Sequence, residues 1–222
     1  IAFYGEQRTP SRCGRLDQAC AFGVMPVNMT FDGNEVFVDK IKVKKPLYWV
    51  FSELNGSKDT VKILSDLNKC YPFAETEIEK NVQKALGIEN EKLISKATKA
   101  IESGDAKQVG SLMVEAQNMF DSMVAPASPK ELAAPQLHKV LNDENIKKYT
   151  YGAKGVGSQG DGSVQFLAKD EQSQAELIKY IKDEYNMDGF TLTLKPEKKV
   201  RKAIIPVAGF GTRLYPETRA IK

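Results

Sequence analysis

The chain has 222 residues, of which 41% are hydrophobic and 27% are charged, and its formal net charge is +3 at pH 7. This composition is typical of a globular protein with a sizeable core; no apolar run is long enough to cross a bilayer, and the N-terminal IAFYGEQRTPSR lacks the apolar segment of a secretory signal. Because Cys13, Cys20 and Cys70 form neither an even disulfide framework nor a closely spaced metal-ligand pair, we expect a cytoplasmic protein with no membrane segment and no metal site of its own.

The first part of the chain predicts one short helix and three strands. The helix is expected to begin near Asp17, whose carboxylate would cap it. Two runs, Val24–Phe31 and Glu35–Ile41, flank the turn signal DGN and predict a hairpin. The aromatic-rich run Pro46–Leu54 predicts a strand that crosses the centre of a sheet, with Trp49 in the core.

Helices are predicted for the middle of the chain. The first would be capped by Ser57 or Asp59. Its expected buried face consists of Val61, Leu64 and Leu67, with Ile63 as a further candidate. Two amphipathic helices follow: Thr76–Leu86, ended by Gly87, and Glu91–Ile101, ended by Gly104. Asp105–Met123 is the clearest helix, because its apolar residues recur at helical spacing along one face.

A proline-rich connection, 125–135, leads into the last third of the chain. Within it, Ser128 and Glu131 have the spacing of a capping box. Pro135 suits the first turn of a short helix that runs to about Asn142. His138, the only histidine, has no carboxylate or cysteine at ligand spacing, so we interpret it as a structural residue.

The stretch 147–168, KKYTYGAKGVGSQGDGSVQFLA, is unusually rich in glycine. It contains a literal GxGxxG at Gly155–Gly160, but a dinucleotide site needs a helix directly after that motif, and Ser163–Leu167 alternates like a strand. Two interpretations stay open from the local sequence: a slack hairpin loop, and a loop whose bare backbone approaches a phosphate.

A helix over Asp170–Tyr185 and a strand over Phe190–Leu194 complete the pattern. Together these elements predict an α+β fold in which helices pack on one face of an antiparallel sheet. We expect this domain to span residues 1–195 and a charged linker to span 196–201.

The C-terminal segment, 202–222, has a different character. An apolar run of buried parallel-strand type, AIIPVA, leads directly into a second glycine loop, which contains Gly209, Gly211, Thr212 and Arg213. Such a loop suits the phosphates of a nucleoside triphosphate. Residues 195–222 carry eight basic and two acidic side chains. Because this charge lies beside a glycine loop that a nucleotide explains better, a nucleic-acid partner is disfavoured. Because this strand has no room to build a sheet, we expect the chain to be a piece of a longer protein.

Two stretches resemble the GHMP small-molecule kinases. CGRLDQ at Cys13–Gln18 resembles the CGxMDQ segment of the galactokinase-like members, and GAKGVGSQGDGSV at Gly152–Val164 resembles their third, glycine-rich motif. The residues Gln117–Asn118 and Pro135–Leu137 also resemble the intervening helices. The resemblance covers about residues 11–195 and implies the C-terminal half of a ferredoxin-like kinase domain that uses ATP and Mg²⁺.

The resemblance also implies roles for individual residues. Asp17 would act on the anomeric hydroxyl of a sugar as general base or charge stabiliser, and Arg12 would steady that carboxylate or a phosphate. Cys13 and Gly14 would contact the substrate. The glycine loop would lie beside substrate and phosphates through six residues: Gly152, Gly155, Gly157, Ser158, Gly160 and Gly162.

The chain also departs from that family. Ser158, Gln159 and Asp161 replace small residues of the common GAGGGG pattern, and Asp161 would repel a phosphate unless it points away. The main ATP loop of the family, a PxxxGLGSSAA-type segment, is absent from the sequence. We therefore expect the 222 residues alone to be inactive and to need the N-terminal half of the kinase as a partner.

The tail resembles a second family. KAIIPVAGFGTRLYPETRAIK, residues 202–222, resembles the opening of sugar-1-phosphate nucleotidyltransferases, close to the UTP–glucose-1-phosphate uridylyltransferases. The resemblance implies that this loop binds UTP or another NTP with Mg²⁺ and that Arg213 stabilises the pyrophosphate leaving group. A kinase and a nucleotidyltransferase in one chain would make an NDP-sugar. The alternative is a nucleotidyltransferase that carries a non-catalytic, kinase-like domain for regulation or assembly.

Overall fold

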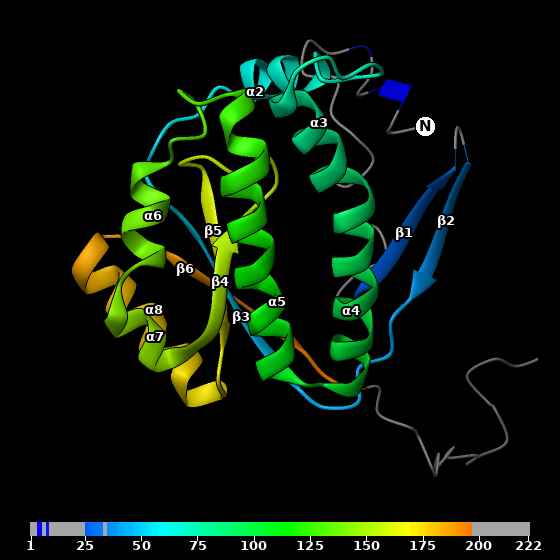
Figure 1. Cartoon of the computed structure of the whole chain (residues 1–222). Coiled ribbons are helices and arrows are strands. Elements are labelled where there is room, and N and C mark those ends of the chain that lie inside the picture. The colour runs from blue at the N-terminus through cyan, green and yellow to red at the C-terminus, as the bar shows by residue number, and fades with distance from the viewer. Residues whose placement is uncertain (1–3, 6–7, 9–24, 33–34, 197–222) are drawn as a thin grey trace, which may run out of the picture.

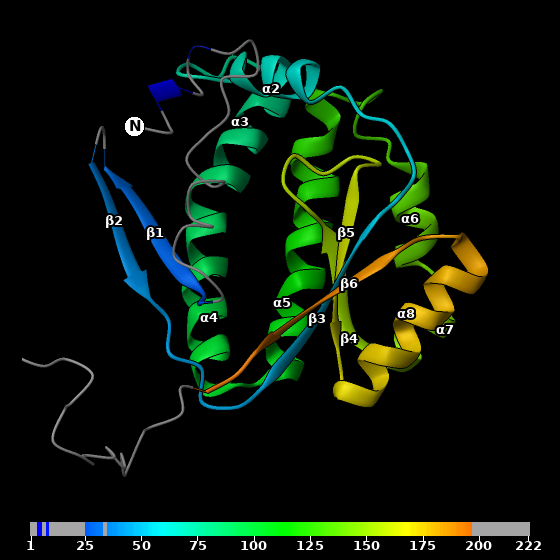
Figure 2. The same cartoon turned by 180° about the vertical axis from the view of Figure 1, so that it is seen from behind.

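The computed structural model describes residues 4–5, 8, 25–32 and 35–196. These residues form two antiparallel sheets and a set of helices (Figure 1). The smaller sheet is the predicted hairpin, with β1 at Val27–Asp32 and β2 at Glu35–Lys40. It stands beside helix α4 (Asn90–Ser103) and away from the main sheet in both views (Figures 1 and 2).

The main sheet has four strands in the order β4-β5-β3-β6, and every neighbouring pair is antiparallel. The predicted central strand is β3, Leu47–Glu53, and the last strand is β6, Gly189–Leu194. Along the chain, β4 (Thr150–Gly155) and β5 (Ser163–Ala168) come between these two strands, although β3 and β6 are direct neighbours in the sheet. Along the chain, the four strands of the main sheet and the helical segments between them follow the order β-α-β-β-α-β, the ferredoxin-like arrangement.

The expected α+β fold with an antiparallel sheet is confirmed, but helices cover both faces of the sheet. On one face lie α4 and α5 (Ala106–Met119), and on the other lie α6 (Pro135–Leu141), α7 (Glu144–Tyr149) and α8 (Glu171–Tyr185) (Figure 1). The reason is visible in β3: Trp49 faces the α4–α5 cluster, whereas Val50 faces the α6–α8 cluster. Both faces of this strand are apolar, so each needs a cover.

Two details of the helix predictions were wrong. In α2, Thr60–Asn68, the buried side chains are Ile63 and Asp66, whereas Val61 is exposed. Gly87 does not end a helix: α3 (Glu77–Lys84) runs through a π-helical kink, η2 (Ala85–Glu89), into α4. The helix predicted over 105–123 is confirmed, because α5 continues into a π-helical turn, η3 (Phe120–Val124), and a 3-10 turn (Ala125–Ala127) follows it. Gly104 does end α4, in the left-handed conformation.

Helix α5 lies directly on β4 because both elements carry a glycine at the point of contact. A β-carbon on Gly152 would lie 2.1 Å from the carbonyl oxygen of Gly110, and one on Gly110 would lie 2.5 Å from the backbone of Tyr151. Real β-carbons do not approach this closely, so any larger residue would push the helix away from the strand.

We expect Gly152→Ala to lower the free energy of unfolding by about 1–3 kcal/mol, because the added methyl group overpacks this contact. Gly110→Ala should have a similar effect, and urea unfolding measures both. The two costs should not add in the double variant, since a helix displaced by one methyl group already makes room for the other. Full additivity would contradict the direct contact.

Candidate functional site

The β4–β5 connection is the part of the predicted glycine loop that the structure shows as a loop. Gly152 and Gly155 lie in β4, so the loop is shorter than the sequence suggested and spans 156–162. Its backbone is left-handed at Gly157, Gln159 and Gly160, with φ of 61°, 63° and 69°. Glycine adopts this conformation without steric cost, which explains two of the three positions. Such a backbone can turn successive N–H groups toward an anion.

Gly155 connects the start of this loop to helix α5. Its N–H donates to Oε1 of Gln117 at 2.8 Å, and Nε2 of Gln117 donates to Oδ1 of Asp121 at 2.8 Å. Gln117 is 4% exposed, so its bond to Gly155 lies away from bulk water, whereas its bond to Asp121 is only partly buried. On its other side Gly155 faces Gln159: a β-carbon here would lie 2.0 Å from Oε1 of Gln159. That oxygen is buried and has no hydrogen-bond partner within the described part of the chain.

Asp161 points away from the loop. Its Oδ1 accepts a hydrogen bond from the backbone N–H of Leu137 at 2.9 Å, in the first turn of α6. A carboxylate at a helix N-terminus is stabilised by the unpaired N–H groups and the helix dipole. The repulsion of phosphate that the sequence raised as a concern is therefore reduced, because this helix end compensates the charge.

Lys58 crosses the loop from the side of α2. Its Nζ donates to the carbonyl oxygen of Gln159 at 2.8 Å, and burial lowers the pKa of its ammonium group. A β-carbon on Gly162 would lie 2.7 Å from Cε of Lys58. Gly162 therefore gives the lysine chain room to reach the loop, which the sequence did not indicate.

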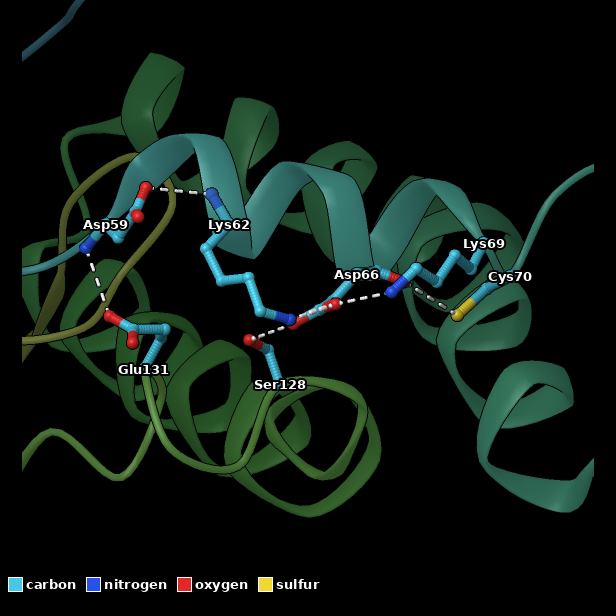
Figure 3. Close-up of polar contacts among 7 residues, drawn as sticks. All are labelled: Asp59, Lys62, Asp66, Lys69, Cys70, Ser128 and Glu131. Carbon is cyan, nitrogen blue, oxygen red and sulfur yellow. Dashed lines mark hydrogen bonds and ion pairs between the residues drawn. The ribbon is translucent and has the colours of Figure 1, made fainter.

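Helix α2 is held in place at both ends (Figure 3). At its start, Oδ1 of Asp59 caps the helix by accepting from the N–H of Lys62 at 2.9 Å, and the N–H of Asp59 donates to Oε2 of Glu131 at 3.1 Å. Since Lys58 directly precedes this cap, the bond to Glu131 also fixes where Lys58 enters the site. Asp59, and not Ser57, is therefore the N-cap of α2.

The second anchor of α2 is the buried carboxylate of Asp66 (Figure 3). It forms ion pairs with Lys62 and with Lys69, the latter at 2.9 Å, and accepts from Oγ of Ser128 at 2.9 Å. The Lys62 ammonium, with help from Lys69 and Ser128, holds the pKa of Asp66 well below its usual range.

The capping-box prediction for Ser128 and Glu131 was wrong. No α-helix begins at Ser128 in the structure; the next one, α6, begins at Pro135. Both polar side chains reach back to α2 instead, one to Asp66 and one to Asp59. The two residues have the spacing of a local capping box, but their partners, Asp59 and Asp66, are more than 60 residues away in the sequence.

The other predicted site residues are distributed unevenly. The loop itself carries Gly157, Ser158, Gly160 and Gly162. The remaining residues lie outside the described part of the chain and stay predictions: Arg12, Cys13, Gly14, Asp17, Gly209, Gly211, Thr212 and Arg213. Among residues 25–32 and 35–196, no group of acidic, histidine or cysteine side chains could hold a metal ion.

Sequence reasoning missed Gln117 and Lys58 as supports of the loop. A signal for Gln117 was present, because it lies on the same face of the helix as Val109 and Met113, where a polar side chain needs a partner. No local signal marked Lys58, since its contact with Gln159 spans 101 residues. Nε2 of His138 lies 3.8 Å from Oδ1 of Asp121 and 35% of the His138 side chain is exposed; its interpretation as a structural residue stays a prediction.

Comparison with known proteins identifies the fold. No family model and no curated protein matches the sequence. Among solved structures, the L. major mevalonate kinase in complex with R-mevalonate matches with a TM-score of 0.65 and 19% identity, over 89% of this chain and 57% of that protein. Lactococcus lactis galactokinase complexed with galactose matches with a TM-score of 0.52 and 13% identity, over 83% and 54%.

A third match is the Streptococcus pneumoniae phosphomevalonate kinase, with a TM-score of 0.52 and 11% identity, over 72% of this chain and 44% of that protein. The chain therefore has a GHMP kinase fold, that of the C-terminal part of these enzymes, and spans only about half of their length. No helix within the described ranges is long and apolar enough to span a membrane.

The anchor at Asp66 predicts a specific dependence of stability on pH. The pKa of Asp66 is lowered in the folded state, so the ionised carboxylate stabilises the fold at a pH above its unfolded pKa of about 4. This stabilisation is lost as the pH falls below that value toward the folded pKa. We expect Asp66→Asn to lower the urea midpoint at pH 7, and we expect the difference from wild type to narrow at pH 3.

Glu77→Gln is the matched control for this measurement. Glu77 also pairs with a lysine, Lys80, at 3.0 Å, but 82% of its side chain is exposed. Its loss should leave the midpoint unchanged at both pH values, since exposed pairs contribute little. Equal effects of the two substitutions would show that burial of Asp66 is not what makes this ion pair stabilising.

Proposed function

We propose that this chain is the C-terminal half of an ATP-dependent kinase domain that phosphorylates the anomeric hydroxyl of a sugar. The observation that carries the proposal is the combination of a GHMP kinase fold with a glycine loop at its β4–β5 connection. The CGRLDQ segment supports a galactokinase-like branch of this fold. The other half of the domain would be supplied by sequence beyond these residues.

In this proposal the loop and Asp17 have separate tasks. The left-handed loop, held by Lys58 and Gln117, would present backbone N–H groups to the phosphates of ATP or to the substrate. Asp17 would accept the proton of the attacking hydroxyl or stabilise its charge while the γ-phosphoryl group is transferred. In this proposal Mg²⁺ would be held mostly by the N-terminal half and by ATP itself.

A second candidate is a kinase-like domain without catalysis, which would regulate or assemble a nucleotidyltransferase. The specific observation in its favour is Gln159, whose side chain is buried against Gly155 where the common family pattern has only small residues. The Gln159 side chain fills the space beside Gly155 that small residues would leave empty. A GLGSSAA-type segment in the coding sequence upstream would favour the kinase, and its absence would rule the kinase out.

We further propose that residues 202–222 begin a sugar-1-phosphate nucleotidyltransferase. This rests on the resemblance of GFGTRL to the nucleotide loop of those enzymes. Gly209, Gly211 and Thr212 would surround the phosphates of UTP or another NTP, and Arg213 would stabilise the pyrophosphate that leaves. The kinase product would then be the second substrate of the adjoining domain, which yields an NDP-sugar.

Asp17→Ala in the natural full-length protein is expected to lower sugar phosphorylation by at least about a hundredfold, because the hydroxyl loses its general base or charge partner. A coupled assay with ATP and a panel of free sugars measures this, and nucleotidyl transfer should stay unchanged. Asp39→Ala, on the exposed side of β2, is the control. A near-normal kinase rate in Asp17→Ala would remove this residue from the mechanism.

Arg213→Ala should give the opposite pattern. We expect nucleotidyl transfer from UTP to fall by about a hundred- to a thousandfold, the usual effect of removing one group that stabilises developing charge. The kinase rate should not change, because the residue belongs to the other domain. A parallel loss of both activities would argue against independent domains.

A further inference from the structure

A cleft of about 510 Å³ lies between the hairpin, helices α4 and α5, and the main sheet. Its walls are largely apolar and include Met29 from β1, Ile94 from α4, and Leu112 and Met113 from α5. The hairpin that forms the outer wall lies beside α4 in both overall views (Figures 1 and 2). A volume of this size is in the range of small-molecule sites.

The floor of the cleft carries a pair of polar side chains on an apolar sheet face. Lys154 of β4 and Gln165 of β5 are cross-strand partners, and both line the cleft beside Trp49. Neighbouring residues on this face, such as Leu167 and Trp49, belong to the apolar cluster under α4 and α5. Lys154 is partly buried on this face, which is unusual because charged residues are seldom removed from water without a partner.

Lys154 has a hydrogen bond but no counter-ion among the described residues. Its Nζ donates to the carbonyl oxygen of Gly155 at 2.8 Å, and no carboxylate within the described part of the chain forms an ion pair with it. Burial also lowers the pKa of its ammonium group. A partly buried cation without a counter-ion among the described residues costs free energy, and two of its three donors have no partner among those residues, so they can bind a ligand.

The chemistry of the cleft selects the class of ligand. A free sugar would need a partner for each hydroxyl, and apolar walls leave such groups unsatisfied. An anion with an apolar body matches both parts of the cleft. We propose that the cleft binds an amphipathic anion, with its carboxylate or phosphate group on Lys154 and Gln165 and its apolar body against Met29, Ile94 and Leu112. This site goes beyond the proposed sugar kinase activity and does not depend on it.

Trp49, the only tryptophan in the chain, provides a direct readout because it lines the cleft. The purified protein is titrated with octanoate, octyl phosphate and 1-octanol while its tryptophan emission is recorded. We expect at least one of the two anions to change the emission saturably and to bind at least about tenfold more tightly than the alcohol. About tenfold is the lower end of the gain in affinity that a hydrogen bond to a charged group gives. The carboxylate and phosphate arms show which head group the site prefers.

Lys154→Met tests the role of the cation. It should remove the preference for the anions and leave the weak binding of 1-octanol, and the variant should unfold at the same urea concentration as wild type or a higher one, because a methionine suits the apolar cleft better. Lys179→Met, on the exposed side of α8, is the control and should bind like wild type. Absence of saturable binding by either anion, equal binding of anion and alcohol, or anion binding unchanged by Lys154→Met would each overturn the proposal.

Discussion

The arrangement of this domain depends on the close contact between helix α5 and strand β4. Glycine at positions 110 and 152 lets the two backbones approach to a distance that no side chain would permit. This approach also brings Gln117, two turns farther along α5, to the N–H of Gly155. The packing of one helix on one strand therefore determines where the β4–β5 loop begins.

The loop is then held from directions that are remote in sequence. Gln117 supports its start, Lys58 binds its middle through the carbonyl of Gln159, and Asp161 ties its end to the N-terminus of α6. These bonds come from three different helices: Gln117 lies in α5, Lys58 precedes the N-cap of α2, and Asp161 binds the first turn of α6. A loop with three left-handed residues has little intrinsic preference for one shape, so these external bonds determine its conformation.

The two faces of the sheet serve different purposes. The face toward α6, α7 and α8 is a closed apolar cluster around Phe166 and Val50. Within the described part of the chain, the face toward α4 and α5 is closed around Leu47 and carries the cleft near Lys154. The hairpin closes this side only in part, because a two-stranded ribbon has no apolar face broad enough to replace a layer of helices.

The sequence by itself determined the class of the fold and the order of its elements. Its density of aromatic residues located β3. Period-two and period-3.6 patterns located β5, α5 and α8, because those patterns record which side of each element is buried. It also identified the glycine loop, since runs of glycine are visible without any partner. The tertiary structure alone decided the second helical layer and the supports of the loop. Ser128, Glu131, Lys58 and Lys154 have partners or surroundings set by distant segments, and a one-dimensional pattern contains no information on which distant segment arrives there.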